Sequence, residues 1–124
     1  MTMATSPQTV LLTGASGFVG RHLVRALSVA YPTTALLAPR LDVRNAAEVT
    51  AAVQAALPEV CVHLAAVSAV TAAGQAPELA WQVNFHGTMH LAWALARYVP
   101  NCQLLFVSSS EAYGASFRGG AKIA

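Results

Sequence analysis

Three glycines at intervals of three residues, Gly14, Gly17 and Gly20, directly follow a short apolar run at residues 10–12. The run is too short for a helix, whereas apolar residues at helical spacing follow the third glycine. This order predicts a buried strand, a tight turn and the start of a helix. The glycines permit the turn, let a ligand approach the backbone, and let the helix pack close to the strand. The unpaired N–H groups at such a helix start suit a pyrophosphate.

The composition favours strands that are buried on both faces of a sheet. Hydrophobic residues make up 56% of the 124 residues and charged residues 10%, which is typical of parallel α/β sheets. The length suits one small domain. A net charge of +2 gives no reason to expect nucleic acid or a membrane as a partner. Residues 1–8 lack the pattern of a secretory signal and residues 60–73 are too short to span a bilayer, so we expect a cytoplasmic protein.

Strands and helices alternate along the chain. Besides the strand at 10–13, we expect strands at 34–38, 60–63 and 104–107, and helices from Gly20 to about residue 30, at 46–57 and at 77–98. Strands separated by helices pair in parallel through right-handed crossovers. The predicted sheet order is therefore 34–38, 10–13, 60–63, 104–107. The fold class is α/β, a doubly wound parallel sheet with about four strands.

Four segments resemble one family. The sequence TGASGFVG at residues 13–20 is similar to the cofactor loop of the extended short-chain dehydrogenases/reductases, which are mostly nucleotide-sugar epimerases, dehydratases and 4-reductases. HLAA at 63–66, VNFHGT at 83–88 and SSSEAYG at 108–114 also resemble family segments. The resemblance implies an incomplete NAD(P)-binding Rossmann domain at 9–114. We expect residues 1–8 to be a disordered tail, and 115–124 to be a tail where the rest of the family fold is missing.

The resemblance implies which residues surround the dinucleotide. In the loop and the helix start these are Gly14, Ser16, Gly17, Phe18, Val19 and Gly20. Farther along they are Leu64, Ala65, Ala66, Asn84 and Ser108. The small side chains of the HLAA segment leave space beneath the cofactor. Asn84 and Gly87 both lower helix propensity in mid-helix, which indicates a local reason for each of them.

Residue 40 bears on the choice between NAD and NADP. An acidic residue about 20 positions after the glycines would bind the ribose diol of NAD, but the sequence there is Ala38-Pro39-Arg40. A guanidinium can pair with a 2′-phosphate, so we expect NADP, with NAD as the alternative cofactor. An ordinary loop arginine is an equally good interpretation of Arg40.

Residues 41–45 resemble the family's Asp-Val pair, in which the aspartate carboxylate faces the adenine amino group. This implies that Asp42 and Val43 contact the cofactor. Asp42 or Asn45 could instead cap the helix at 46–57. We assign Asp42 to the adenine and Asn45 to the cap.

The SSSEAYG segment implies the catalytic groups. Ser109 lies four residues before Tyr113, the position of the family's catalytic hydroxyl, and Glu111 lies where dehydratases carry an acid. None of the three tyrosines is followed by lysine four residues later, so the family's Tyr-x-x-x-Lys pair is missing. We therefore expect a truncated cofactor-binding portion of an NAD(P)-dependent epimerase, dehydratase or 4-reductase that transfers hydride at sugar C4. The alternative is a catalytically inactive dinucleotide-binding regulator or scaffold.

The family resemblance also bears on partners, because family dimers commonly use the helix that corresponds to 77–98. We expect a nucleotide-sugar substrate in the full-length enzyme, and a homodimer through this helix as a further hypothesis. His86 and His90 have the spacing of two zinc ligands but lack a third, so we predict no metal site. His63 is interpreted as a hydrogen-bonded histidine at a strand end rather than a catalytic base. Cys61 and Cys102 are interpreted as reduced thiols.

Overall fold

The computed structural model describes residues 5–67 and 74–109. Its strands are β1 Thr9–Thr13, β2 Ala35–Leu37, β3 Val60–His63 and β4 Gln103–Phe106. Its helices are α1 Phe18–Ala30, α2 Ala46–Ala56, α4 Pro77–Trp81 and α5 Gly87–Tyr98, with a π-helical turn at Gln82–His86 between the last two. None of the helices in these residues is long and apolar enough to cross a membrane.

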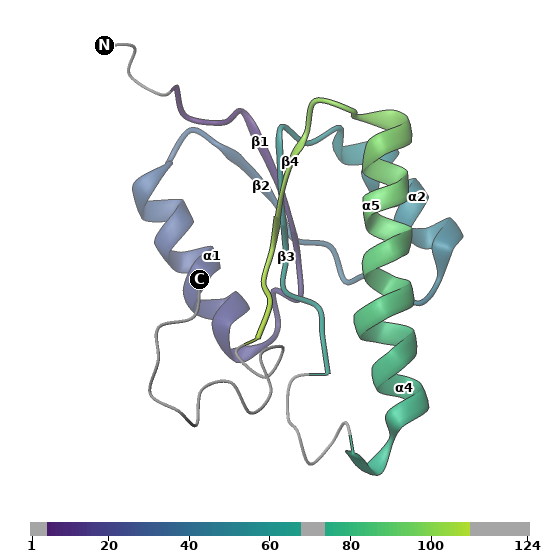
Figure 1. The fold of residues 1–124 in the computed structure, drawn as a ribbon. Helices are drawn as coiled ribbons and strands as arrows, with labels where there is room; N and C mark the ends of the chain where they lie inside the picture. The colour runs from purple at the N-terminus through teal and green to yellow at the C-terminus, as the bar shows by residue number, and fades with distance from the viewer. Residues whose placement is uncertain (1–4, 68–73, 110–124) are drawn as a thin grey trace, which may run out of the picture.

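The four strands form one parallel sheet in the order β2-β1-β3-β4 (Figure 1). This confirms the order predicted from the alternation of strands and helices. Leu11 pairs with Leu37 on one side and with Cys61 on the other, and Cys61 pairs in turn with Leu104. The carboxyl ends of all four strands therefore lie at the same edge of the sheet.

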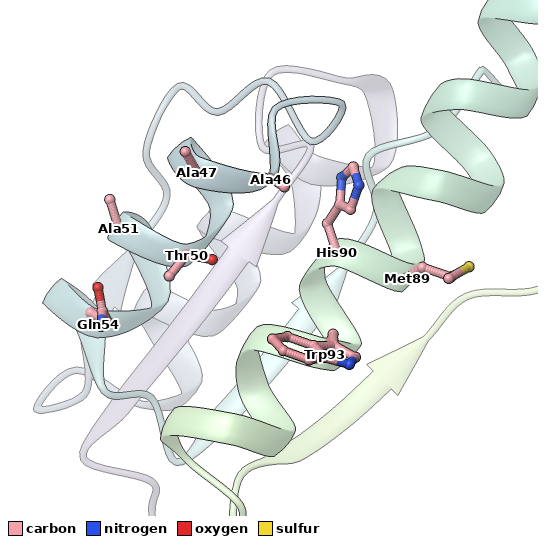
Figure 2. Close-up of a pocket in the computed structure, with 8 residues that line it drawn as sticks. All are labelled: Ala46, Ala47, Thr50, Ala51, Gln54, Met89, His90 and Trp93. Atoms are coloured by element: carbon pink, nitrogen blue, oxygen red, sulfur yellow. The ribbon is translucent and has the colours of Figure 1, made fainter.

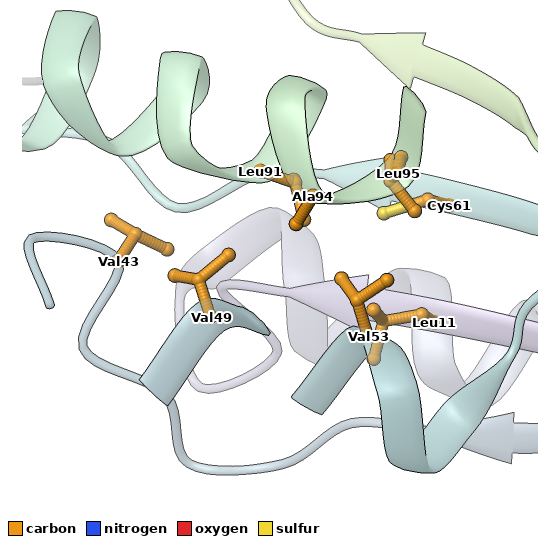
Figure 3. Packing of buried hydrophobic residues seen from close by; sticks show 8 residues of the cluster. All are labelled: Leu11, Val43, Val49, Val53, Cys61, Leu91, Ala94 and Leu95. Atoms are coloured by element: carbon orange, nitrogen blue, oxygen red, sulfur yellow. The ribbon is translucent and has the colours of Figure 1, made fainter. Parts of the chain in front are cut away.

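Helices cover both faces of the sheet, as predicted for a doubly wound fold. Helix α1 lies on one face, and α2 and α5 lie on the other (Figure 1). Successive residues of a strand point to opposite faces, so Val10 and Leu12 pack toward α1 whereas Leu11 packs toward α2 and α5. The larger cluster joins strand and helix residues: Leu11, Val43, Val49, Val53, Cys61, Leu91, Ala94 and Leu95 (Figure 3).

Cys61 belongs to this core, as its interpretation as a small hydrophobic residue requires. Burial raises the pKa of its thiol to about 12, so the thiolate is suppressed at neutral pH. Cys102 is partly buried and packs against the same cluster, and burial raises the pKa of its thiol as well. Both cysteines are free thiols.

Local signals at two helix starts are confirmed. The Asn45 side chain accepts a hydrogen bond from the Glu48 backbone N–H at 3.1 Å and caps α2. Pro77 occupies the first turn of α4, where its missing N–H costs no hydrogen bond. The start of the sheet is also fixed, because Gln8 accepts a backbone hydrogen bond from Ala35.

The prediction that residues 104–107 form a buried strand is wrong in one respect. The strand forms, but Leu105 is 57% exposed and Phe106 is 52% exposed. In the described part of the chain β4 pairs with β3 alone, so its other edge and much of both its faces are in contact with solvent.

The helix at 77–98 differs from the prediction at its centre. The Gly87 backbone N–H bonds to the Gln82 carbonyl, five residues back, in place of the usual four. This extra residue rotates the following helix relative to the preceding one. Met89 and Trp93 are exposed, whereas Ala94 joins the core.

Candidate dinucleotide-binding site

The glycine-rich turn between β1 and α1 packs directly on the segment that follows β3. Gly14 has φ of +74°, which is strained for any residue with a side chain. A Cβ atom there would lie 2.6 Å from the Ala65 nitrogen and 2.7 Å from the Leu64 carbonyl carbon. The predicted requirement for glycine at the turn is therefore met twice, by the backbone angle and by the close approach.

Gly20 allows the start of α1 to pack against the turn itself. A Cβ atom on Gly20 would overlap the Gly14 carbonyl oxygen and would lie 2.7 Å from the Ala15 Cα. The third glycine was expected to bring the helix close to the strand. The structure shows that Gly20 instead packs against the loop backbone at Gly14 and Ala15, just beyond the end of β1.

Gly17 differs from the other two, because the fold does not require glycine there. A Cβ atom would meet only the Gly14 carbonyl oxygen, at 3.4 Å, and the φ of −71° suits any residue. Gly17 is the N-cap of α1, which has no side-chain cap and no acidic residue in its first turn. The helix start therefore leaves N–H groups and its partial positive charge available to an anion. These features fit the pyrophosphate of a dinucleotide.

Side chains around this turn are open to solvent. Ser16, Phe18 and Val19 are exposed, and Phe18 makes an edge contact with the His22 ring at 4.9 Å between centroids. Val19 is 58% exposed. Its exposure at the helix start leaves Val19 compatible with the predicted cofactor contact.

The segment after β3 is fixed at both ends. The Thr13 hydroxyl oxygen accepts hydrogen bonds from the N–H groups of Leu64 and Ala65, both at 3.2 Å. At the other end Asn84 Oδ1 accepts from the Val67 N–H at 2.8 Å, and Asn84 Nδ2 donates to the Val67 carbonyl at 3.1 Å. The local reason expected for Asn84 is thus a two-bond clamp on the backbone at 67. Ala66 is exposed between these anchors.

The residues predicted to meet the adenosine lie after β2. Arg40 is exposed. The Arg44 Nε and Nη2 atoms donate to the two carboxylate oxygens of Asp42 at 2.9 and 2.8 Å, and the Arg44 backbone N–H donates at 3.0 Å. The side-chain hydrogen bonds from Arg44 are the main reason that the pKa of Asp42 is lowered. Asp42 is therefore a carboxylate that already has a cationic partner, which sequence reasoning missed.

Val43, the residue after Asp42, faces the protein interior instead. Its side chain is buried in the core cluster at 3% exposure, and its carbonyl accepts a hydrogen bond from His90 Nδ1 at 3.0 Å. The predicted contact of Val43 with the cofactor is therefore restricted to its backbone. The same bond gives His90 a role in packing α5. In residues 5–67 and 74–109 no three His, Cys, Asp or Glu side chains are grouped so that they could hold a metal ion.

Ser108 and Ser109 follow β4 after one residue, Val107, and are exposed. They share the carboxyl edge of the sheet with the glycine-rich turn and the segment at 64–66. The strand order reverses between β1 and β3, which is where doubly wound sheets bind ligands. Glu111 lies outside the described residues, as do Tyr113 and the predicted tail at 115–124.

An open groove of about 480 Å³ lies elsewhere, between α2 and α5 (Figure 2). Its lining consists of Ala46, Ala47, Thr50, Ala51, Gln54, Met89, His90 and Trp93. None of these is a predicted cofactor residue. The glycine-rich turn, with its open helix start and backbone donors, is chemically the better candidate for a nucleotide.

Known proteins resemble this chain in sequence and in fold. The model of the NAD dependent epimerase/dehydratase family matches residues 10–122. A GDP-6-deoxy-D-mannose reductase from Pseudomonas aeruginosa is 34% identical over 109 residues, which cover 86% of this chain and 36% of the relative.

Solved structures give the same result. The dTDP-4-dehydrorhamnose reductase of Bacillus anthracis in complex with NADP has a TM-score of 0.75 and 26% identity, over 86% of this chain and 38% of that one. The Thermus thermophilus UDP-glucose 4-epimerase complex with NAD has a TM-score of 0.73 and 27% identity, over 82% and 37%. The chain thus spans 36% to 38% of the length of these proteins. Because the family model matches most of its length, the chain belongs to the NAD dependent epimerase/dehydratase family.

Proposed function

We propose that residues 14–20 bind the pyrophosphate of NADP and that the protein is the cofactor-binding portion of an enzyme that oxidises or reduces a nucleotide sugar at C4. The observation that carries this proposal is Gly17. It caps a helix that has no side-chain cap, and a Cβ atom on it would make only an ordinary contact of 3.4 Å with the Gly14 carbonyl oxygen among the described residues. A glycine that the fold itself does not require is expected where a ligand must touch the backbone.

The preference for NADP over NAD rests on position 40. Arg40 is exposed just beyond β2, the strand next to the glycine-rich turn, and the chain has no acid there to bind a ribose diol. The related reductase of B. anthracis was solved with NADP, whereas the T. thermophilus epimerase was solved with NAD. The guanidinium of Arg40 is proposed to pair with the 2′-phosphate.

The bound nicotinamide would supply the hydride acceptor or donor. Ser109, at the carboxyl end of β4, would donate a hydrogen bond to the C4 oxygen of the sugar and stabilise the charge that develops on it. Glu111 would remove the proton next to the 4-keto group if the enzyme is a dehydratase, and so a lyase. The nucleotide-sugar class of substrate follows the relatives, one of which is a GDP-6-deoxy-D-mannose reductase. We place this activity in the cytoplasm.

We also propose that the protein is a homodimer through α4 and α5. Trp81, Phe85, Met89 and Trp93 recur every four residues and are all exposed, by 45% to 68%. Side chains at this spacing share one helix face, so they form an apolar stripe along the helix. Glu78 and Arg97 are the charged residues of the helical segment 77–98, and Arg97 lies over the Trp93 ring at 5.7 Å.

A non-catalytic regulator or scaffold is the second candidate. It is favoured by one sequence observation, namely that none of the three tyrosines precedes a lysine by four residues. Such a protein would bind the dinucleotide equally well but would turn over no sugar. Cofactor binding therefore tests the site, and turnover separates the two candidates.

Calorimetric titration of NADP into three forms of the chain tests the site. Gly17→Val puts a branched side chain where the pyrophosphate is proposed to lie, so binding should be lost while thermal stability is kept. Gly74→Val is the matched control, because in the part of the chain that the structure describes nothing beyond its chain neighbours lies within 4 Å of a Cβ at that position, and it should bind like the wild type. Equal affinity of wild type and Gly17→Val would refute the proposed site.

A further inference from the structure

Two buried polar side chains lie beneath the candidate site and take no part in the proposed chemistry. Thr13 is 1% exposed and His63 is 3% exposed, at the carboxyl ends of β1 and β3. The Thr13 Oγ1 and the His63 Nδ1 are 2.6 Å apart, and the His63 Nε2 lies 2.9 Å from the Thr88 Oγ1. Both ring nitrogens are therefore occupied by hydroxyl groups.

The partners of the two threonine hydroxyls favour one direction for each hydrogen bond in this chain of groups. The Thr13 Oγ1 accepts from the Ala65 N–H and shares the Leu64 N–H with the Thr13 carbonyl oxygen, which uses both of its acceptor positions and directs its proton to His63 Nδ1. At the other side, the Thr88 hydroxyl donates to the Asn84 carbonyl at 2.7 Å. Thr88 must then accept from His63 Nε2–H. The ring is consequently neutral, with its proton on Nε2.

These bonds connect the glycine-rich turn with the segment after β3 and with the helical segment that contains Asn84 and Thr88. Thr13 immediately precedes Gly14, whose backbone packs on Leu64 and Ala65. Asn84, bonded to Thr88, holds the backbone at 67 through its carboxamide. The position of the glycine-rich turn thus depends on a segment that Thr13, bonded to His63, holds at one end. Asn84, whose backbone carbonyl is bonded to Thr88, holds it at the other.

We infer that His63, in its neutral Nε2–H form, is a positioning residue that fixes the glycine-rich turn against residues 64–67 and so sets the affinity for the dinucleotide. This inference rests on the proposed function. His63 cannot act on a substrate directly, because it is buried and both nitrogens are engaged. A charged ring would direct an Nδ1–H at an oxygen that has no acceptor position left, and the arrangement would break.

The tautomer of His63 can be measured without any ligand. Nitrogen-15 spectra of the imidazole rings in the free protein at neutral pH should show one neutral histidine with its proton on Nε2, assigned to His63 by its loss in His63→Gln. A proton on Nδ1, or a charged His63 ring at neutral pH, would overturn the inference.

Matched variants at Thr88 test the consequence for binding. Thr88→Val keeps the shape but removes the hydroxyl, so the dissociation constant for NADP should rise about five- to tenfold. Thr88→Ser restores the hydroxyl and should recover the wild-type value, which a purely steric role would not explain. Thr50→Val on α2, an equal change outside the network, should bind like the wild type.

The outcomes separate the two proposals. If the wild type binds NADP and Thr88→Val binds equally well, the positioning role is refuted and the site stands. If the wild type binds no NADP, the proposed function fails and the positioning role fails with it, whatever the tautomer. Loss of binding in both Thr88 variants would also refute the inference, because the hydroxyl would not be the group that matters.

Discussion

Gly87 and Val43 are packed so closely that a Cβ atom on Gly87 would lie 2.6 Å from the Val43 Cγ2. Val43 is buried and cannot move aside freely. This contact joins the segment after β2 to the start of α5. It explains why residue 87, within the helical segment 77–98, is a glycine.

The contact predicts the effect of Gly87→Ala. At an ordinary helix position this change would stabilise the protein by about 1 kcal/mol, but overpacking here should lower the free energy of unfolding by about 1–3 kcal/mol. Urea denaturation measures the change. Val43→Ala in the same chain should remove much of the penalty, as a double-mutant cycle would show. A stabilised Gly87→Ala would contradict the described packing.

Arg40→Ala should weaken NADP binding more than NAD binding, by about 1–3 kcal/mol, since a charged hydrogen-bonded pair is lost. Calorimetry with both cofactors measures the difference. Arg25→Ala, another exposed arginine on α1, is the control and should leave the ratio of affinities unchanged. If Arg40→Ala weakens both cofactors equally, Arg40 does not recognise the 2′-phosphate.

His63 should make stability depend on pH. Burial lowers its pKa below the ordinary value of 6.5, and its ring contacts, Thr13, Thr88 and Phe106, carry no charge. Below pH 6.5 the His63 side chain is protonated in the unfolded chain but stays neutral in the folded chain. The free energy of unfolding should therefore fall as the pH falls through about 6.5, until the folded-state pKa is reached.

Urea titrations between pH 5 and 8 would measure this slope. His63→Gln should remove its contribution, whatever its effect on overall stability, whereas His22→Gln on the exposed side of α1 should retain it. An unchanged slope in His63→Gln would show that the proton is taken up elsewhere.

The apolar stripe on α4 and α5 predicts self-association. Sedimentation equilibrium should show a dimer, and Trp93→Glu should shift it toward monomer, because a carboxylate would be buried in the interface. Val29→Glu, at an 80% exposed position on α1, is the control and should remain dimeric. A wild type that stays monomeric at all concentrations would exclude the proposed interface.

The chain of 124 residues should show no epimerase, dehydratase or reductase turnover with GDP-, UDP- or dTDP-hexoses. A general base is commonly worth about 10²- to 10⁴-fold, and the sequence has no Tyr-x-x-x-Lys pair to supply one. Absorbance of reduced nicotinamide and product chromatography are the measurements. Turnover that disappears in Ser109→Ala would mean that another residue acts as the base.

Much of the fold could be predicted because its signals are local. The order of the strands follows from alternating strands and helices, and the Asn45 cap follows from residue type and position. Gly14 could be assigned to a turn because few residues other than glycine adopt a φ near +74°.

The remaining features depend on contacts between distant segments. The π-helical turn at Gln82–His86 shifts the inward face of α5, and no apolar spacing in the sequence marks such an insertion. Thr13, His63 and Thr88 are separated by tens of residues and meet only once three elements are assembled. The one available signal was polar residues at the ends of otherwise apolar strands.

The parallel sheet has a consequence for how the protein is made. Of the four described strands β1 is synthesised before the others, yet Val10 pairs with Leu36 and with Val60, so no hairpin partner is available to it within this sheet. Closing such long loops before any contact is gained makes sheets of this kind slow to form. β1 therefore remains unpaired on at least one side until residues Val60–His63 have emerged from the ribosome.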